Sequence, residues 1–427
     1  MRVLVVGGGG REHAICWKLR QSKELSELFC APGNPGIAEV ADCVPIAGEE
    51  IGKLAEFAVD LKIDLTVVGP ELPLTLGIVD EFERRDLKIF GPRQAAAELE
   101  GSKVFAKEFM ERHEIPTAEF EIAHTAAEAR KAIKKLGLPI VLKADGLAAG
   151  KGVFIAKDRK EAEAALDVLF EERRFGSSGD RVLVERCLEG EEVSLIAMCD
   201  GRRVLPLATS KDYKRIGDDD TGPNTGGMGA HSPSGVLSAL EAAEVIERVM
   251  RPVVDGMAQE HRMFKGFLYA GLMLTANGPK VLEFNVRLGD PEAQPVLLRM
   301  TDDLLPVLKQ GAGGRFEQAR LDFRREASAC IVLAAGGYPD APVVGDQIFG
   351  IEDATGRSGA VVFHAGTKLE GEKLVTAGGR VLGVSATGAT LREALRIAYQ
   401  AAADIHWKGQ TYRGDIGRRV LESAGAD

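Results

Sequence analysis

Two oxygen-bearing side chains and an arginine lie close together in the second half of the chain. Glu283 and Asn285 are two residues apart in a run that predicts a strand, so both side chains point to the same face. Carboxylate and amide oxygens suit Mg²⁺ bridging polyphosphate oxygens, and Arg287 suits developing negative charge. The pattern favours phosphoryl transfer over a strand that merely ends in exposed polar residues.

A glycine-rich run at 146–152 joins two predicted strands, 140–144 and 153–156. It is not a Walker A motif, because Gly152 stands where that motif has the Ser or Thr that holds magnesium. A glycine-rich hairpin can close over phosphates with its backbone amides, while a lysine such as Lys143 supplies a compact positive charge. We predict a lid over phosphates, the alternative being a flexible β-turn.

A third cluster opens the chain, where the predicted strand 3–6 runs through four glycines at 7–10 into a predicted helix at 11–20. A strand that leads through glycines into a helix offers free N–H groups and the positive end of the helix dipole to an anion. The dinucleotide fingerprint GxGxxG fails here, because Glu12 or His13 replaces its third glycine. We expect a site for a substrate phosphate; a tight turn without a ligand and an NAD site are the alternatives.

The fourth cluster is a stretch at 210–229 that is dense in charge and glycine. Its three successive aspartates, 218–220, are a weak indication of calcium or magnesium. We predict an ordered substrate-binding segment within a long polar loop, and the alternative is a solvated loop.

Composition and charge exclude several classes of protein. Of the 427 residues, 45% are hydrophobic and 28% are charged, which is ordinary for a globular chain. The net charge is −10 and no basic block is longer than a pair, so we expect no nucleic-acid partner. No stretch reaches the roughly 18 apolar residues of a membrane span, and the first residues lack the features of a signal peptide.

Other catalytic chemistries have little support in the sequence. The six cysteines form no CxxC pair, which predicts buried, reduced thiols in a cytosolic protein. No HExxH pattern and no Gly-x-Ser-x-Gly elbow occurs, so zinc hydrolysis and serine catalysis are not expected. Fifty glycines, about 12% of the chain against a typical ~7%, instead indicate phosphate handling.

The elements that must position these residues change in character near residue 101. Before it, short apolar strands near 3–6, 28–30, 65–68 and 88–90 alternate with helices, which is typical of a doubly wound parallel sheet. Such sheets bind ligands at the carboxyl ends of their strands. After residue 101 the pattern becomes α+β, and the tail is strand-rich with one helix.

Taken in order, these clusters and several further segments identify a family. The segments are GGREHA (9–14), APGN (31–34), TVVGPELPL (66–74), KIFGP (88–92), ELEGSK (98–103), IPTAEF (115–120), LKADGLAAGKGV (142–153), DTGPNTGGMGA (220–230), GFLYAGLM (266–273), LEFNVRLGDPEAQP (282–295), AAGGYP (334–339), FHAGTK (363–368) and DIHW (404–407). The chain resembles the phosphoribosylamine–glycine ligase family of the ATP-grasp superfamily over essentially its whole length.

The resemblance implies a fold and a domain division. The expected fold is a mixed α/β and α+β multidomain ATP-grasp fold, with an N-terminal doubly wound parallel-sheet domain and a strand-rich C-terminal domain. The expected domains are an N-terminal domain at 1–101, a central ATP-grasp domain at 102–121 plus 191–326, a small lid at 122–190 and a C-terminal domain at 327–427.

The resemblance also implies a reaction, in which ATP, glycine and 5-phosphoribosylamine give glycinamide ribonucleotide, ADP and phosphate in purine biosynthesis. The glycine carboxylate is phosphorylated to glycyl phosphate, which the amine then attacks. A carboxylate is a poor electrophile until it is phosphorylated, and phosphoryl transfer needs positioning and charge more than a covalent nucleophile. Lysines, magnesium ligands and an arginine meet that need.

The family's site residues carry over to matching positions. Those expected at ATP are Lys103, Lys143, Gly146, Gly150, Lys151, Gly152, Glu185 near the adenine and Glu192 on the ribose. Those expected at the metal, Mg²⁺ or Mn²⁺, are Glu283 and Asn285, and those expected at the reacting groups are Arg287, Asp290 and Asp212. Those expected at phosphoribosylamine and the reaction centre are Gly8, Gly9, Gly10, Asn34, Glu71, Asn224, Gly226 and Gly227.

Small molecules are therefore the expected partners, and we expect a cytoplasmic monomer with at most transient contact to neighbouring purine-pathway enzymes. Two alternatives stay open at this point. One is another ATP-grasp ligase with a different carboxylate or amine, such as a biotin-dependent carboxylase. The other is a nucleotide-binding protein without turnover, or an NAD-dependent oxidoreductase that uses the first glycine cluster.

Overall fold

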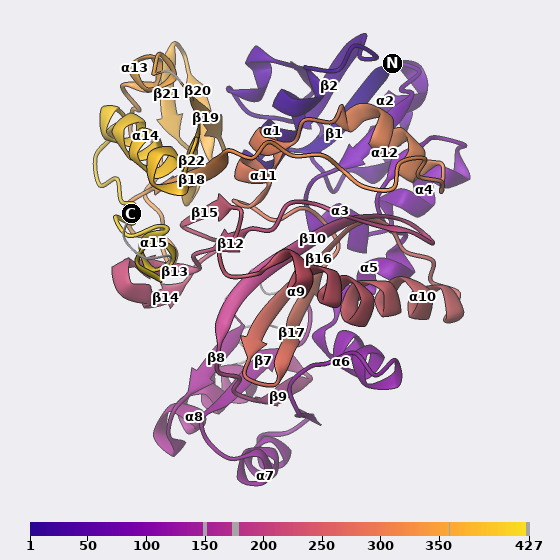
Figure 1. Cartoon of the computed structure of the whole chain (residues 1–427), viewed down its shortest axis with the longest axis vertical. Helices are drawn as coiled ribbons and strands as arrows, with labels where there is room; N and C mark the ends of the chain where they lie inside the picture. Colours follow the sequence, from indigo (N-terminus) through magenta and orange to yellow (C-terminus); the bar gives the residue numbers. More distant parts are fainter. Residues whose placement is uncertain (148–151, 173–178, 358, 424–427) are drawn as a thin grey trace.

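A parallel sheet forms the N-terminal part of the computed structural model, which describes residues 1–147, 152–172, 179–357 and 359–423 (Figure 1). Its strands, in the spatial order β3-β2-β1-β4-β5, are β3 (Asp42–Cys43), β2 (Glu27–Pro32), β1 (Arg2–Gly7), β4 (Leu65–Val68) and β5 (Ile89–Phe90). The helices of this part are α1 (Gly10–Leu19), α2 (Ile51–Asp60), α3 (Glu71–Thr75), α4 (Ile78–Arg84) and α5 (Gln94–Gly101), with a short turn of helix at Ile37–Glu39.

Both faces of this sheet are buried. Along β1, Val3 and Val5 belong to one apolar cluster, whereas Leu4 and Val6 belong to another. A strand covered on both sides needs apolar residues at every position, which explains the continuous apolar run of β1. The predicted doubly wound sheet is confirmed, and its strands end at the glycine and Gly-Pro-Glu turns.

The central sheet is antiparallel, with the strand order β11-β10-β16-β17. Its strands are β10 (Glu191–Asp200), β11 (Val204–Pro206), β16 (Lys265–Thr275) and β17 (Gly278–Asn285). The helices nearest to it in sequence are α6 (Lys103–Arg112), α9 (Ala239–Val245), a π-helical turn (Ile246–Met250), α10 (Arg251–Gln259), α11 (Ala293–Arg299) and α12 (Leu304–Ala312). The register between β16 and β17 shifts at Gly271 and Leu272, close to Glu283.

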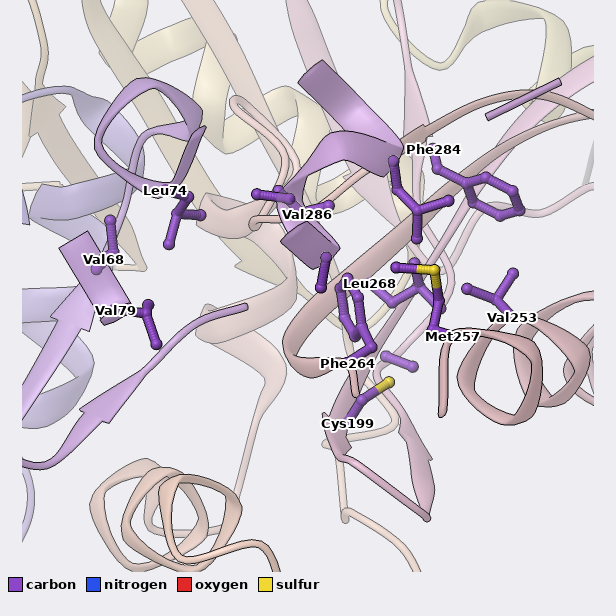
Figure 2. Packing of buried hydrophobic residues seen from close by; sticks show 14 of the residues in the cluster. Val68, Leu74, Val79, Cys199, Val253, Met257, Phe264, Leu268, Phe284 and Val286 are labelled. Carbon is purple, nitrogen blue, oxygen red and sulfur yellow. The ribbon is translucent and has the colours of Figure 1, made fainter. Parts of the chain in front are cut away.

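One apolar core joins the central sheet to the N-terminal part (Figure 2). The residues that Figure 2 labels in this cluster are Val68, Leu74 and Val79 from the N-terminal part and Cys199, Val253, Met257, Phe264, Leu268, Phe284 and Val286 from the centre. Burial of such side chains contributes about 1.5–3 kcal/mol each. The shared core holds the end of β17 close to the loops of the parallel sheet.

A separate four-stranded antiparallel sheet has the order β6-β9-β7-β8 and a small core of its own. The unit that contains this sheet consists of β6 (Phe120–Ala123), α7 (Ala126–Leu136), β7 (Ile140–Ala144), β8 (Val153–Ala156), α8 (Arg159–Leu166), a π-helical turn (Asp167–Glu171) and β9 (Val182–Arg186). The predicted hairpin is present, because β7 and β8 pair antiparallel on either side of the glycine-rich run. In Figure 1 this unit lies at the opposite end of the molecule from the parallel sheet.

The last sheet has the order β12-β15-β18-β22-β19. Its elements and neighbours are β12 (Lys211–Asp212), β15 (Gly229–Ser232), β18 (Ala327–Ala334), α13 (Ile351–Thr355), β19 (Ala360–His364), β20 (Thr367–Glu370), β21 (Lys373–Thr376), β22 (Arg380–Gly388), α14 (Leu391–Asp404) and α15 (Arg418–Ser423). No helix in the described ranges is both long enough and apolar enough to cross a bilayer.

The polar stretch at 210–229 differs from the long loop that its composition predicts. It forms β12, a hairpin of β13 (Arg215–Gly217) and β14 (Thr221–Asn224) around a short turn of helix (Asp218–Asp220), and the start of β15. The reason is long-range pairing, since β15 hydrogen-bonds to β18 about a hundred residues later in the chain. No local pattern of the stretch reveals that partner.

Candidate active site

The end of β17 places Glu283 next to a lysine from the polar stretch. Glu283 Oε1 lies 3.3 Å from Lys214 Nζ. The charge of Lys214, helped by Lys143 and Lys103, lowers the pKa of Glu283 to about 2 in spite of burial. The carboxylate is therefore ionised at neutral pH and lies amid three ammonium groups, a suitable place for a polyanion held through a cation.

Arg287 lies just beyond Asn285 and bridges several acceptors. Its Nη2 donates to Asn285 Oδ1 at 3.0 Å and lies 3.0 Å from Glu100 Oε1, while its Nε is 3.3 Å from Glu71 Oε2. Burial raises the pKa of Glu100 to about 7 although Arg287 opposes this. The predicted residues Asn285, Arg287 and Glu71 thus form one group, and Glu100, which sequence reasoning missed, completes it.

Lysines from two units meet at Glu185. Its carboxylate is 2% exposed and lies 2.8 Å from both Lys143 Nζ and Lys107 Nζ. Although burial acts in the opposite direction, the two lysines lower the pKa of Glu185. Lys143 also donates to the carbonyl oxygen of Leu282 at 3.1 Å, one residue before Glu283. The small sheet is therefore linked directly to the end of β17.

Lys103 lies at the first turn of α6, which Ser102 caps by accepting the Phe105 N–H. Its Nζ donates to the carbonyl oxygen of Gly146 at 2.7 Å, so it reaches the start of the glycine-rich run. Gly146 has a φ of +91°, a conformation that favours glycine. Gly152 is described where its carbonyl accepts the Ala144 N–H, whereas Gly150 and Lys151 lie outside the described residues.

Lys107 was missed, although it lies four residues after Lys103 on a predicted helix and so shares its face. Mainly through burial, its pKa falls to about 8. Its contact with Glu185 makes it part of the lysine group.

A hollow opens between β10, β16, β17 and β12. Its lining residues are Glu192, Val193, Ser194, Asp212, Lys214, Tyr269, Gly271, Leu272 and Leu282. Asp212 Oδ1 is buried there and has no hydrogen-bond partner. Burial and the nearby Glu292 raise the pKa of Asp212. Two neighbouring buried carboxyl groups with an unused oxygen suit a cation such as an amine.

Glu292 is a third residue of the candidate site that sequence reasoning missed, after Glu100 and Lys107. It is 2% exposed and accepts a hydrogen bond from Ser194 Oγ at 3.4 Å, and Ser194 is also 2.7 Å from the Tyr269 hydroxyl. Its only sequence signal is its place two residues after Asp290.

Asp290 is held by an arginine from the last sheet. Arg380 Nη2 lies 3.2 Å from Asp290 Oδ2, and Arg380 Nη1 donates to the carbonyl oxygen of Gly226 at 2.7 Å. A Cβ on Gly227, whose φ is +116°, would come within 2.8 Å of Asp212 Oδ1. Gly226, Gly227 and Asp290 are thus brought together. Arg380 was also missed, because nothing in the sequence of its strand distinguishes it from an ordinary surface arginine.

The N-terminal glycines lie on the other side of Asp290. Cβ atoms built on Gly9 and Gly10 would each lie 3.6 Å from an Asp290 carboxylate oxygen. The Gly9 N–H donates to Glu12 Oε2 at 2.6 Å, so Glu12 closes the first turn of α1. Asn34 Nδ2 donates to the carbonyl oxygen of Gly8 at 3.0 Å.

Two further predicted residues lie on strands around this centre. Glu192, at the start of β10, lines the hollow with an exposed side chain. Asn224 ends β14 and pairs with Arg215 in the hairpin.

The site offers few protein ligands to a metal ion. In the described ranges no group of three or more His, Cys, Asp and Glu side chains could hold a metal ion. Glu283 and Asn285 do offer two hard oxygen donors at one strand end. Such a pair fits a cation whose remaining ligands are phosphate oxygens and water.

Paired lysines at a glycine-rich hairpin, facing a strand that ends in a carboxylate and an amide, indicate an ATP-grasp enzyme. A family model described as the ATP-grasp (A) domain of phosphoribosylglycinamide synthetase matches residues 101–293. The models of the N and C domains of the same synthetase match residues 1–100 and 328–419. The chain belongs to the phosphoribosylglycinamide synthetase family.

Individual relatives and solved structures support the same family assignment. The chain is 49% identical to phosphoribosylamine–glycine ligase of Escherichia coli K12, with 99% of each chain covered. A crystal structure of that ligase from Thermotoga maritima matches with a TM-score of 0.84 and 38% identity, covering 97% of this chain and 100% of that one. The biotin carboxylase domain of Hydrogenobacter thermophilus 2-oxoglutarate carboxylase, 17% identical with a TM-score of 0.74, shares the fold.

The resemblance, the fold class and the expected enzyme class, an ATP-dependent carboxylate–amine ligase of purine biosynthesis, are confirmed.

Proposed function

We propose that the hollow and the end of β17 carry out the family's reaction, the ATP-dependent joining of glycine to 5-phosphoribosylamine, with the residues assigned below. One observation carries the assignment. Lys214 lies at Glu283, and the charges of Lys143, from the small sheet, and Lys103, from α6, act on the same carboxylate. Three cations around one ionised metal-ligand carboxylate suit the phosphates of ATP in transfer.

The phosphate side of the site consists of Lys103, Lys143 and Lys214 around Glu283. Here the lysines hold the transferring phosphate, and the glycine-rich run covers it with backbone amides. We extend this role to Gly146, Gly150, Lys151 and Gly152, of which the middle two are not described. Glu185 would face the adenine and Glu192 the ribose.

Glu283 and Asn285 would hold Mg²⁺ or Mn²⁺. The ion, when bound, neutralises phosphate charge and so makes the phosphorus open to attack. Arg287, fixed by Glu71 and Glu100, directs its charge to the same place.

The amine side of the site consists of Asp212 and Glu292. We assign to it the ammonium group of glycine, because Asp212 Oδ1 is buried without a partner. This orientation leaves the glycine carboxylate directed toward Lys214 and the phosphate side. Glycine phosphorylated there is then attacked by the amine of phosphoribosylamine, which we place against Gly8, Gly9, Gly10, Asn34, Glu71, Asn224, Gly226 and Gly227, with Asp290 between the two substrates.

We further propose that the protein is a cytoplasmic monomer with the four domains predicted above. All six cysteines are free, which supports a reducing compartment, but the prediction that all are buried is wrong, because Cys43 is exposed and Cys187 is half-buried. Contact with neighbouring purine-pathway enzymes would be transient.

The direct test uses glycine labelled with ¹⁸O in its carboxylate. We expect ADP release that requires both glycine and phosphoribosylamine, with label appearing in the released phosphate. ADP release without glycine, or unlabelled phosphate, would remove the glycyl-phosphate route from this site.

A further inference from the structure

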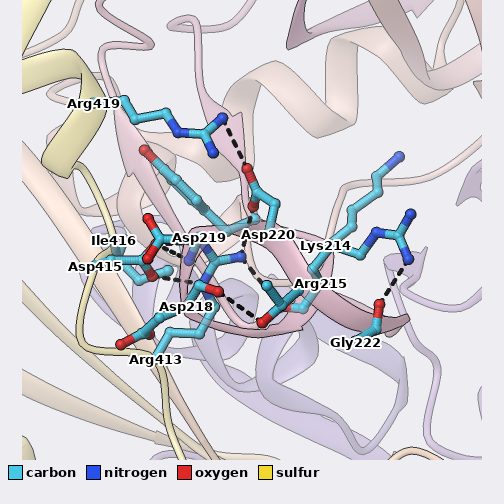
Figure 3. A network of polar contacts seen from close by, with 12 residues as sticks. Lys214, Arg215, Asp218, Asp219, Asp220, Gly222, Arg413, Asp415, Ile416 and Arg419 are labelled. Carbon is cyan, nitrogen blue, oxygen red and sulfur yellow. Dashed lines mark hydrogen bonds and ion pairs between the residues drawn. The ribbon is translucent and has the colours of Figure 1, made fainter.

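A buried arginine binds the polar hairpin to the end of the chain (Figure 3). Arg413 is 1% exposed, and its Nε and Nη2 each donate to one Asp415 carboxylate oxygen at 2.7 Å. Its Nη1 donates to Asp220 Oδ1 at 2.9 Å and to the carbonyl oxygen of Arg215 at 3.2 Å. The guanidinium is therefore held by its own segment, through Asp415, and by the hairpin segment 215–220, which lies almost two hundred residues earlier in the chain.

The three successive aspartates join this network instead of a metal ion. Asp218 Oδ1 accepts the Gly414 N–H at 2.8 Å, and the Asp219 N–H donates to Asp415 Oδ2 at 2.9 Å. Arg419 Nη1 lies 3.0 Å from Asp220 Oδ2, and Arg418 pairs with Asp219. We call this set the clasp, which comprises Asp218, Asp219, Asp220, Arg413, Asp415, Arg418 and Arg419.

The clasp encloses Tyr213, the residue between two members of the hollow. The Arg413 guanidinium carbon lies 5.2 Å from the centre of the Tyr213 ring, and the Tyr213 hydroxyl accepts the Gly417 N–H at 3.0 Å. Tyr213 is 6% exposed and belongs to the apolar core of the last sheet.

The backbone around Tyr213 is extended and paired. The Tyr213 N–H donates to the Gly229 carbonyl, and the Tyr213 carbonyl accepts the Met228 N–H. Successive side chains of an extended segment point to opposite faces. Asp212 and Lys214 accordingly both line the hollow, whereas Tyr213 points into the last sheet's core.

We propose that Arg413 is a positioning residue for the amine side of the site. By holding the Tyr213 ring against the last sheet, it fixes the backbone from which Asp212 and Lys214 reach the hollow. An arginine over an aromatic ring and in bidentate contact with a carboxylate is more rigid than an ion pair alone. This proposal rests on the role proposed above for Asp212.

The test is the Arg413→Met variant of the full chain, assayed for glycine-dependent ADP release. We expect the KM for glycine to rise at least tenfold, while the KM for ATP stays within twofold of wild type. Arg419→Met, which removes the same charge from the exposed rim of the clasp, is the matched control and should leave both values within twofold. A folded Arg413→Met protein with an unchanged KM for glycine overturns the proposal.

Two further variants keep the test decisive. Arg413→Met leaves Asp415 buried without its main partner, so Arg413→Met with Asp415→Asn removes the unpaired charge if the single variant does not fold. Arg413→Lys keeps the charge but not the bidentate contact, and we expect its KM for glycine to lie between those of wild type and Arg413→Met. If both Arg413→Lys and the double variant have the wild-type KM for glycine, the proposal is contradicted.

The Asp212→Asn variant separates this proposal from the one on which it rests. If it changes the KM for glycine and Arg413→Met does not, only the clasp proposal fails. If Asp212→Asn itself leaves the KM unchanged, the assignment of the amine side fails and the clasp proposal fails with it.

Discussion

Two carboxylates on either side of Lys214 have opposite electrostatics: Asp212 lines the hollow, and Glu283 follows its lining residue Leu282. On the phosphate side, Lys214 and two further lysines lower the pKa of Glu283 to about 2. On the amine side, burial and Glu292 raise the pKa of Asp212. A carboxylate surrounded by cations suits the binding of an anion through a metal ion. Two buried acids with an oxygen that has no hydrogen-bond partner suit the binding of a cation. This contrast underlies our proposal that the site holds both ends of a zwitterion beside ATP.

The largest expected effect is on the phosphate side. Glu283→Ala removes the carboxylate that we assign to the metal and leaves three lysines without their shared anion. We expect kcat to fall at least about a thousandfold, equivalent to ~4 kcal/mol of transition-state stabilisation, with the fold unchanged by circular dichroism. The measurement is ADP release at saturating Mg²⁺. Asn285→Asp, which keeps two oxygen donors, is the matched variant; a near-normal rate in Glu283→Ala would contradict the assignment.

The next effect separates the amine side from the phosphate side. Asp212→Asn removes the charge that we assign to the glycine ammonium, so the KM for glycine should rise about a hundredfold, or ~2.7 kcal/mol, with little change in the KM for ATP. Because burial and the nearby Glu292 raise the pKa of this carboxyl, its ionised form is less favourable in the folded protein than in the unfolded chain.

The same variant should therefore raise the melting temperature at pH 7 while it weakens glycine binding. Differential scanning calorimetry at pH 7 measures this. A lower melting temperature would argue that Asp212 serves the fold and not the substrate.

A smaller effect comes from the turn that faces Asp212. Gly227→Ala combines a left-handed φ of +116° with a Cβ that would lie 2.8 Å from Asp212 Oδ1. Gly345→Ala is the matched control, since its φ is +93° and nothing lies within 4 Å of its Cβ. Backbone strain should cost each variant about 1 kcal/mol of stability, and Gly227→Ala should lose more than that because its Cβ would also lie 2.5 Å from Pro291 Cδ. Only Gly227→Ala should also raise the KM for glycine, by about tenfold; equal KM values in the two variants would show that the turn does not position Asp212.

The last effect concerns stability alone and not activity. The contributions of Glu100 and Glu283 to the free energy of unfolding change with pH in opposite directions. Folding raises the pKa of Glu100 from 4.5 to about 7, so the folded state holds a proton that the unfolded chain has lost between these values. Its contribution to stability therefore declines as pH rises from about 4.5 to about 7. Folding lowers the pKa of Glu283 from 4.5 to about 2, so its contribution is present above 4.5 and is lost as pH falls toward 2.

Urea unfolding at pH 5 and pH 7 tests the first of these. Glu100→Gln should change the difference in the free energy of unfolding between the two pH values by about 1–2 kcal/mol in favour of pH 7. The same difference in Glu283→Gln should remain that of wild type, because Glu283 is ionised in the folded state at both values. An unchanged difference in Glu100→Gln would place the pKa of that group outside this window.

The outcome for particular residues shows how far local pattern carries. The buried strand β1, the hairpin of β7 and β8 and the same-face pair of Glu283 and Asn285 were predicted from short runs, since each depends on a period of two or on an apolar segment bounded by glycine. Glu100, Glu292 and Arg380 were missed, because each is an ordinary polar residue on a helix, turn or strand. They gain their role only from Arg287, Asp212 and Asp290, which lie far from them in sequence.

The polar stretch shows the same limit. We predicted an ordered substrate-binding segment, with three aspartates that weakly indicated a metal. In the structure Asp218, Asp219 and Asp220 are instead bound by Arg413, Arg418, Arg419 and the backbone of 414. Those partners come nearly two hundred residues later.

By itself, then, the sequence determined the class of chemistry, the parallel sheet and the family, because phosphate handling and strand patterns are encoded in short segments. Only the tertiary structure decided which charges face each other. Electrostatic character depends on burial and on the distance to the nearest opposite charge. Both are set when β12 pairs with β15, β15 pairs with β18, and the shared core brings the end of β17 to the N-terminal loops.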